Sequence, residues 1–133
     1  DLNENTANIE KLSNLEENQK ELEDMLKYDI LEIYDFKGID DTSYKVKIKN
    51  NSQKNLGNII LKVAEKNSDG EYISVSNISN NSTLKAKDFS ALMLNSTDKE
   101  NTLEIIGYTY DDIENKSNID IDLKTNTASI VRN

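Results

Sequence analysis

The stretch Tyr44-Lys45-Val46-Lys47-Ile48-Lys49 decides the fold class of this chain. Apolar and charged side chains alternate strictly in it, and successive side chains of a β-strand point to opposite faces of the sheet. One face therefore packs Tyr44, Val46 and Ile48 on a core, while the other carries a row of solvated lysines. A period of two residues predicts a strand rather than a helix.

Further strands are predicted on both sides of this one. After the run Ile59–Ala64, whose Ile59, Leu61 and Val63 share one face, the pair Asp69-Gly70 predicts a hairpin, because Gly accepts a positive φ. The other apolar runs that we interpret as strands are Tyr28–Phe36, the segment with Tyr72, Val75 and Ile78, the run Leu84–Met93, the run Leu103–Tyr110, and the alternating residues Ile119, Ile121 and Leu123.

Two of these runs carry a local irregularity. Leu84 and Ala86 share one parity, whereas Phe89, Ala91 and Met93 share the other, so we expect a bulge or a change of sheet at Lys87-Asp88. In the two-sided apolar run Leu103–Tyr110, Gly107 indicates a close backbone approach. The tail Ala128–Val131 either extends the last strand or adds an edge strand.

Residues 1–27 are expected to form a separate amphipathic helix. Leu12, Leu15, Leu22 and Leu26 follow heptad spacing, and Gln19 takes the remaining position of the stripe. Two interpretations stay open: the stripe packs on its own domain or on a neighbouring copy, or it forms a stalk or short coiled coil. Residues 28–133 are expected to form the β domain, because one core of ordinary size suits this length.

Charge and composition exclude several classes of function. Acidic residues outnumber basic ones 25 to 16, and the net charge of −9 opposes binding to nucleic acids and to anionic membrane surfaces. No apolar run reaches the roughly 18 residues that a membrane-spanning helix needs. The chain starts without Met, so we expect either a mature form or a shortened chain from which a targeting segment has been removed.

The sequence holds no recognisable catalytic machinery. It has neither His nor Cys, which removes nucleophilic triads, thiolate metal sites and the usual general base near neutral pH. Its four glycines are scattered, so no phosphate-binding loop is present. We therefore predict that the chain is not an enzyme and needs no cofactor.

Calcium is the only metal for which the sequence offers candidate ligands. We expect these acidic residues to be solvated residues of turns rather than ligands. Calcium takes six to eight oxygen ligands from loops, and two short acidic segments supply several, but neither has EF-hand spacing. The candidate residues are Asp40, Asp41, Asp111, Asp112 and Glu114.

Two further groups of residues can be explained either by a structural role or by binding of a ligand. The row Lys45, Lys47, Lys49 suits an acidic polymer, but it is more typical of a solvated face that discourages edge pairing of strands. The tyrosines form either a ligand platform or, as we expect, part of the core and its margin; they are Tyr28, Tyr34, Tyr108 and Tyr110.

The chain resembles the FxLYD domains in the order of three motifs. These are immunoglobulin-like domains of bacterial, Firmicute-type surface lipoproteins. The motifs are the alternating strand that ends in Asn50-Asn51-Ser52, the apolar run Ile59–Val63, and the Asp69-Gly70 hairpin. The stretch with this resemblance runs from Tyr44 to Asp111, about half of the chain. The resemblance implies an extracytoplasmic domain of a Gram-positive-type bacterium, often carried behind a lipid-anchored Cys that this chain lacks.

Together these observations predict a mainly β protein. The expected fold is an immunoglobulin-like antiparallel β-sandwich of about seven strands, preceded by one N-terminal helix. The expected function is that of a non-catalytic extracytoplasmic binding or spacer module, whose partner is a protein or a cell-wall component. The alternative is a structural assembly unit that oligomerises through the helix. Contact with a membrane is expected only through a lipid anchor outside this chain.

Overall fold

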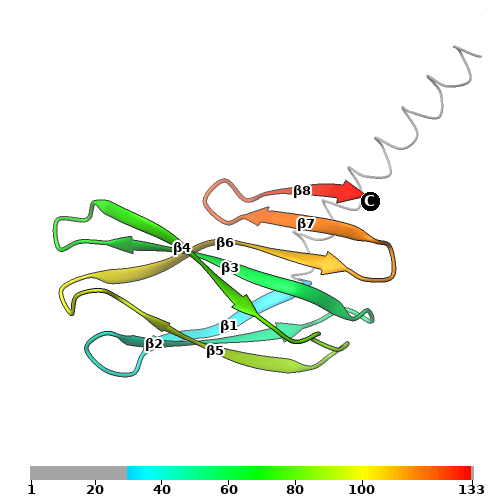
Figure 1. Cartoon of the computed structure of the whole chain (residues 1–133), viewed down its shortest axis with the longest axis horizontal. Helices are drawn as coiled ribbons and strands as arrows, with labels where there is room; N and C mark the ends of the chain where they lie inside the picture. Colours follow the sequence, from blue (N-terminus) through cyan, green and yellow to red (C-terminus); the bar gives the residue numbers. More distant parts are fainter. Residues whose placement is uncertain (1–29, 133) are drawn as a thin grey trace, which may run out of the picture.

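The computed structural model describes residues 30–132 as a mainly β protein of two antiparallel sheets (Figure 1). One sheet has three strands in the order β1-β2-β5, and the other has five in the order β4-β3-β6-β7-β8. The strands are β1 (Leu31–Gly38), β2 (Ser43–Asn50), β3 (Leu56–Lys66), β4 (Tyr72–Asn80), β5 (Phe89–Asn95), β6 (Thr102–Asp112), β7 (Ser117–Asp122) and β8 (Thr127–Arg132).

The predicted N-terminal helix of residues 1–27 lies outside the described residues. Among residues 30–132 there is no helix with the length and apolar character needed to cross a membrane. The eight strands exceed the predicted seven because the tail Ala128–Val131 belongs to a strand of its own, β8, which pairs with β7 and forms an edge.

The strict alternation in β2 and β3 places their apolar residues in the core, as predicted. Val46 and Ile48 are fully buried, and their lysine neighbours lie on the outer face. Ile59, Leu61 and Val63 of β3 are likewise buried. The predicted hairpin is confirmed, because β3 pairs with β4 and Gly70 between them has a φ of +82°.

The segment before β5 changes sheets, which confirms one of the two predicted explanations of its parity. Leu84 forms a bridge with Leu56 of β3, whereas β5 pairs with β2 of the other sheet. Lys87 between them has a φ of +64°, a conformation that redirects the chain.

The prediction that Phe89, Ala91 and Met93 of β5 face the core is wrong. Phe89 and Met93 are each 55% exposed, and Leu92 and Leu94 face the core instead. Both parities of β5 are apolar, so alternation within the strand does not decide which face is buried. The register with β2 decides it: Leu92 lies opposite the buried Val46, and Met93 opposite the outer Lys45.

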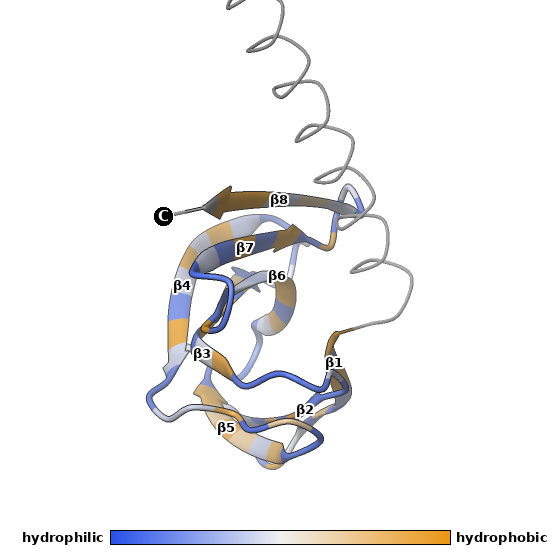
Figure 2. Cartoon of the chain, turned by 90° about the vertical axis from the view of Figure 1, so that its right-hand side faces the viewer, coloured by the Kyte–Doolittle hydropathy of each residue, from blue (hydrophilic) through white to orange (hydrophobic). Residues whose placement is uncertain are grey.

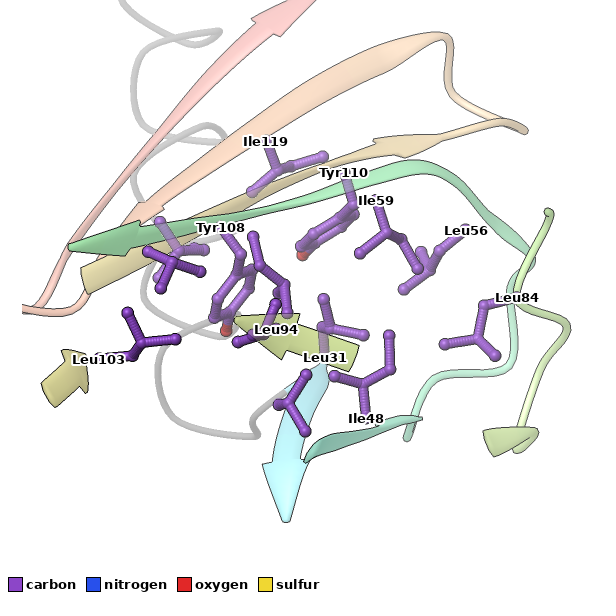
Figure 3. Packing of buried hydrophobic residues seen from close by; sticks show 14 residues of the cluster. Leu31, Ile48, Leu56, Ile59, Leu84, Leu94, Leu103, Tyr108, Tyr110 and Ile119 are labelled. Carbon is purple, nitrogen blue, oxygen red and sulfur yellow. The ribbon is translucent and has the colours of Figure 1, made fainter. Parts of the chain in front are cut away.

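The core lies between the two sheets (Figure 3). Tyr108 and Tyr110 of β6 share it with Leu31, Ile48 and Leu94 of the three-stranded sheet. Each fully buried aliphatic side chain contributes about 1.5–3 kcal/mol relative to an exposed one. Gly107 makes the close approach that the sequence predicted, since a Cβ there would lie 2.6 Å from the carbonyl oxygen of Ile121.

Candidate functional site

The first pair of calcium candidates lies in the turn between β1 and β2. Asp40 Oδ1 accepts hydrogen bonds from the backbone N–H groups of Thr42, at 3.1 Å, and Ser43, at 2.8 Å. These bonds favour the charged form and hold the pKa of the Asp40 carboxyl below its usual range. The carboxylate therefore closes the turn, and its neighbour Asp41 is exposed.

The second group lies at the end of β6 and in the turn that follows it. Burial raises the pKa of Asp112, but hydrogen bonds from Lys54 and Asn115 outweigh it and keep that pKa below its usual value. Lys54 Nζ lies 3.1 Å from Asp112 Oδ2. Asp111 accepts hydrogen bonds from the amides of Asn58 and Asn118.

These contacts occupy the candidate oxygens with protein partners. Glu114 is exposed in the following turn. Across residues 30–132, no three acidic side chains come together in a group suited to a metal ion. The carboxylates of Asp40 and Asp112 are therefore explained as structural groups that fasten turns.

The lysine row and the tyrosines separate into surface and core. Lys47 lies 3.9 Å from Asp35 of β1, and Lys49 Nζ lies 5.1 Å from the centre of the Phe89 ring. Tyr108 and Tyr110 are buried and their rings stack, so they belong to the core as expected. Tyr34 is 44% exposed on the outer face, and Tyr28 lies outside the described residues. The described tyrosines therefore do not form one platform.

Two clefts lie away from these features. One of about 420 Å³ lies on the outer face of the five-stranded sheet over Gly107, and its Lys62 pairs with Asp120 at 3.1 Å. The other, of about 500 Å³, lies between β1 and the five-stranded sheet and is lined by apolar residues such as Phe36 and Ile105. The charged groups Lys62 and Asp120 in the first cleft satisfy one another, which leaves less for a ligand to recognise.

The feature that stands out chemically is a pair of edge strands that contain no charged residue. Strand β4 has nine residues, β5 has seven, and neither contains Asp, Glu, Lys or Arg, although 31% of the chain is charged. Each strand is an edge of its sheet, and the two lie on the same side of the molecule (Figure 2). Ser90 Oγ donates to Asn80 Oδ1 at 3.1 Å and connects them. We call residues 72–80 and 89–95 the uncharged side.

Large apolar groups are exposed on this side. Every residue from Tyr72 to Asn77 is exposed, and β4 pairs with β3 along one edge only. The exposed large apolar residues of the uncharged side are Tyr72, Ile73, Val75, Phe89 and Met93, which are five of the ten in the described part of the chain.

The edge strand β1 has features that protect it from pairing with another strand. It carries Glu32, Asp35 and Lys37, and its pairing with β2 shifts register between Ile33 and Asp35. Charges and bulges of this kind discourage pairing with another strand. Strand β4 has neither Pro nor a charged residue, and its one register shift lies at the Tyr72 end.

Sequence reasoning missed this surface. A signal was present, since residues 72–80 and 89–95 are the two strand segments without charge on either side of one loop. Apolar residues that alternate along a strand carry the same signal whether they face a core or a partner.

No known family model and no curated protein matches this sequence.

Proposed function

We propose that residues 30–132 form an immunoglobulin-like domain that serves as a non-catalytic, extracytoplasmic binding module. The strand orders support the fold: β1-β2-β5 faces β4-β3-β6-β7 in the manner of the two Greek-key sheets of such domains, with β8 added beyond. The absence of His and Cys from the whole chain supports the non-catalytic role.

The uncharged side is the observation that carries the proposal. Centres of protein–protein interfaces are depleted in charged residues and enriched in aromatic residues and Met. Strand β4 exposes Tyr72, and strand β5 exposes Phe89 and Met93. Neither strand contains a charged residue, although Lys124 Nζ lies 3.7 Å from the centre of the Tyr72 ring and Lys49 Nζ lies 5.1 Å from that of Phe89. A solvated surface has no such need to avoid charge, so we assign this side to a protein partner rather than to a cell-wall polymer.

Strand addition is the mode of binding that suits β4. A free edge presents backbone N–H and C=O groups that an extended segment of a partner pairs with, and neighbouring side chains provide selectivity. Exposed Ile73 and Val75 lie beside that backbone edge.

The extracytoplasmic location is part of the proposal and is supported by the resemblance to FxLYD domains of bacterial lipoproteins. Attachment to a membrane then comes from a lipid anchor outside this chain. Protease treatment of intact source cells tests the location: loss of the domain without lysis supports it, and protection until lysis contradicts it. The alternative, an assembly unit that oligomerises through residues 1–27, depends on residues outside the described part.

Differential capture tests the binding role. Four forms of the full chain are immobilised: the natural chain, Val75→Lys, Met93→Lys and the control Val131→Lys, which adds the same charge to β8 at the opposite edge. Envelope proteins of the source organism are applied and the bound fraction is quantified by mass spectrometry. We expect at least one protein that the natural chain and Val131→Lys retain and that the other two lose about tenfold. Identical retention by all four forms would refute the proposal.

A further inference from the structure

The free edge of β4 has room for another strand. Its pairing with β3 runs from Ile59↔Asn80 to Lys66↔Tyr72 and uses one edge of the strand. No strand among residues 30–132 pairs with its other edge. An antiparallel strand laid along that edge would satisfy the outward backbone groups and cover Ile73 and Val75.

We infer that the partner which adds to this edge is a second copy of the chain, paired antiparallel through its own β4. The inference rests on the proposed binding role of the uncharged side and names its partner. The two five-stranded sheets would then form one continuous sheet across a two-fold axis. In the simplest register Val75 lies opposite Val75 of the second copy, which sets two branched apolar side chains side by side.

Charge is the argument for a second copy. At a two-fold contact each residue near the axis meets its own copy, so a charged residue there faces a like charge. Pairing of β4 with β4 avoids this, because the strand contains no charge and its two-fold mate contains none either. A foreign protein has no such constraint, because its residues do not meet their own copies. The uncharged strand therefore fits self-association.

The size of the contact predicts a weak dimer. Stable interfaces bury about 1,200–2,000 Å² in total, whereas one pair of short strands buries less than that. We therefore expect dissociation within a concentration series from about 1 µM to about 1 mM. Salt should strengthen the dimer, because screening weakens the repulsion between the two acidic copies. A dimer held by ion pairs would respond in the opposite way.

Sedimentation equilibrium of the full chain tests the inference. The forms compared are the natural chain, Val75→Lys and the control Val131→Lys. The two valines are 59% and 61% exposed on edge strands of the same sheet, so the substitutions match in size, charge and exposure. We expect the natural chain and Val131→Lys to dimerise with similar dissociation constants. In Val75→Lys two lysines meet across the axis, and its constant should rise at least about tenfold.

Two results would overturn the inference. One is a natural chain that stays monomeric at about 1 mM and high salt; if capture of a foreign protein still depended on Val75, only the identity of the partner would be wrong. The other is a dimer that Val75→Lys and Val131→Lys leave equally intact, because association would then use another surface, such as residues 1–27.

Discussion

Val75 and Val131 occupy matching places at the two edges of the five-stranded sheet, with exposed fractions of 59% and 61%. Both lie on its outer face, Val75 opposite Ala64 of β3 and Val131 opposite Asn118 of β7. Because neither side chain packs in the core, we expect Val75→Lys and Val131→Lys each to change the free energy of unfolding by less than about 0.5 kcal/mol. Urea denaturation at low protein concentration measures this. A loss above about 2 kcal/mol in either variant would show that the valine supports the fold itself.

Asn50 connects the end of β2 to the segment that changes sheets. Its buried Nδ2 donates to the carbonyl oxygens of Lys54, at 2.7 Å, and Leu84, at 3.0 Å. Asn50→Asp has nearly the same shape but turns an acceptor toward both carbonyls. We expect it to lower the free energy of unfolding by about 3 kcal/mol.

Asn81→Asp is the control for this change, because Asn81 is exposed in the loop after β4. It makes the same isosteric change of charge at the surface, and we expect an effect within about 0.5 kcal/mol. Denaturant unfolding of both variants at neutral pH measures the difference. Equal stability of the two would contradict the structural role of Asn50.

Gly107 allows the backbones of β6 and β7 to approach. A Cβ at this position would lie 2.6 Å from the carbonyl oxygen of Ile121, which is backbone and has little freedom to move. We expect Gly107→Ala to destabilise the protein by about 1–3 kcal/mol. At Gly38 the nearest atom to an added Cβ is Tyr44 Cε1 at 4.0 Å, so Gly38→Ala should be nearly neutral or slightly stabilising. Thermal unfolding that ranks the two variants in the reverse order would disprove this account.

Glu65 fastens the loop between β5 and β6. Its Oε2 accepts hydrogen bonds from Thr97 N at 3.0 Å and from Asn101 Nδ2 at 2.6 Å. Burial raises the pKa of Glu65, but the hydrogen bonds from Thr97 and Asn101 outweigh it and hold the pKa below its ordinary value of 4.5. The carboxylate therefore stabilises the fold fully above pH 4.5, and this contribution disappears as the pH falls through the lower pKa of the folded state.

Glu65→Gln should remove this dependence on pH. At neutral pH we expect it to lower the free energy of unfolding by about 1–3 kcal/mol, and the difference from the natural chain should shrink as the pH approaches about 3. Glu71→Gln, in the exposed turn before β4, is the control. Urea denaturation across this range of pH measures both variants. A difference for Glu65→Gln that stays constant down to the lowest pH would count against the role of the carboxylate.

The buried face of a strand could be predicted from the sequence where apolar residues occupy only alternate positions. It could not be predicted where both sets of alternate positions are apolar. In β2 only Val46 and Ile48 are apolar at the centre, so alternation alone decides which face is buried. In β5 Leu92 and Met93 both suit a core, and the choice depends on register with a strand distant in sequence. The Asp69-Gly70 hairpin was predictable because its signal is local.

The lack of charge in residues 72–80 and 89–95 is visible in the sequence, but the position of these residues at the sheet edges could not be predicted. Apolar residues such as Val75 and Phe89 carry the same sequence signal whether they face the core or a partner, and only the strand order shows that β4 and β5 are edges. The acids that suggested calcium are adjacent in sequence, but Asp40 and Asp112 are engaged by turn amides and by Lys54. Composition does not reveal such pairing.

Hydrogen exchange along β4 tests the central claim most directly, namely that this edge is the contact surface and pairs with a second copy. Exchange of backbone amides is followed in the full chain at about 1 µM and at about 1 mM, the range over which a weak dimer forms. The account predicts that outward amides of β4 gain protection at the higher concentration, whereas those of β8, the other edge of the sheet, do not. Unchanged exchange in β4, or an equal gain in both edge strands, would contradict it.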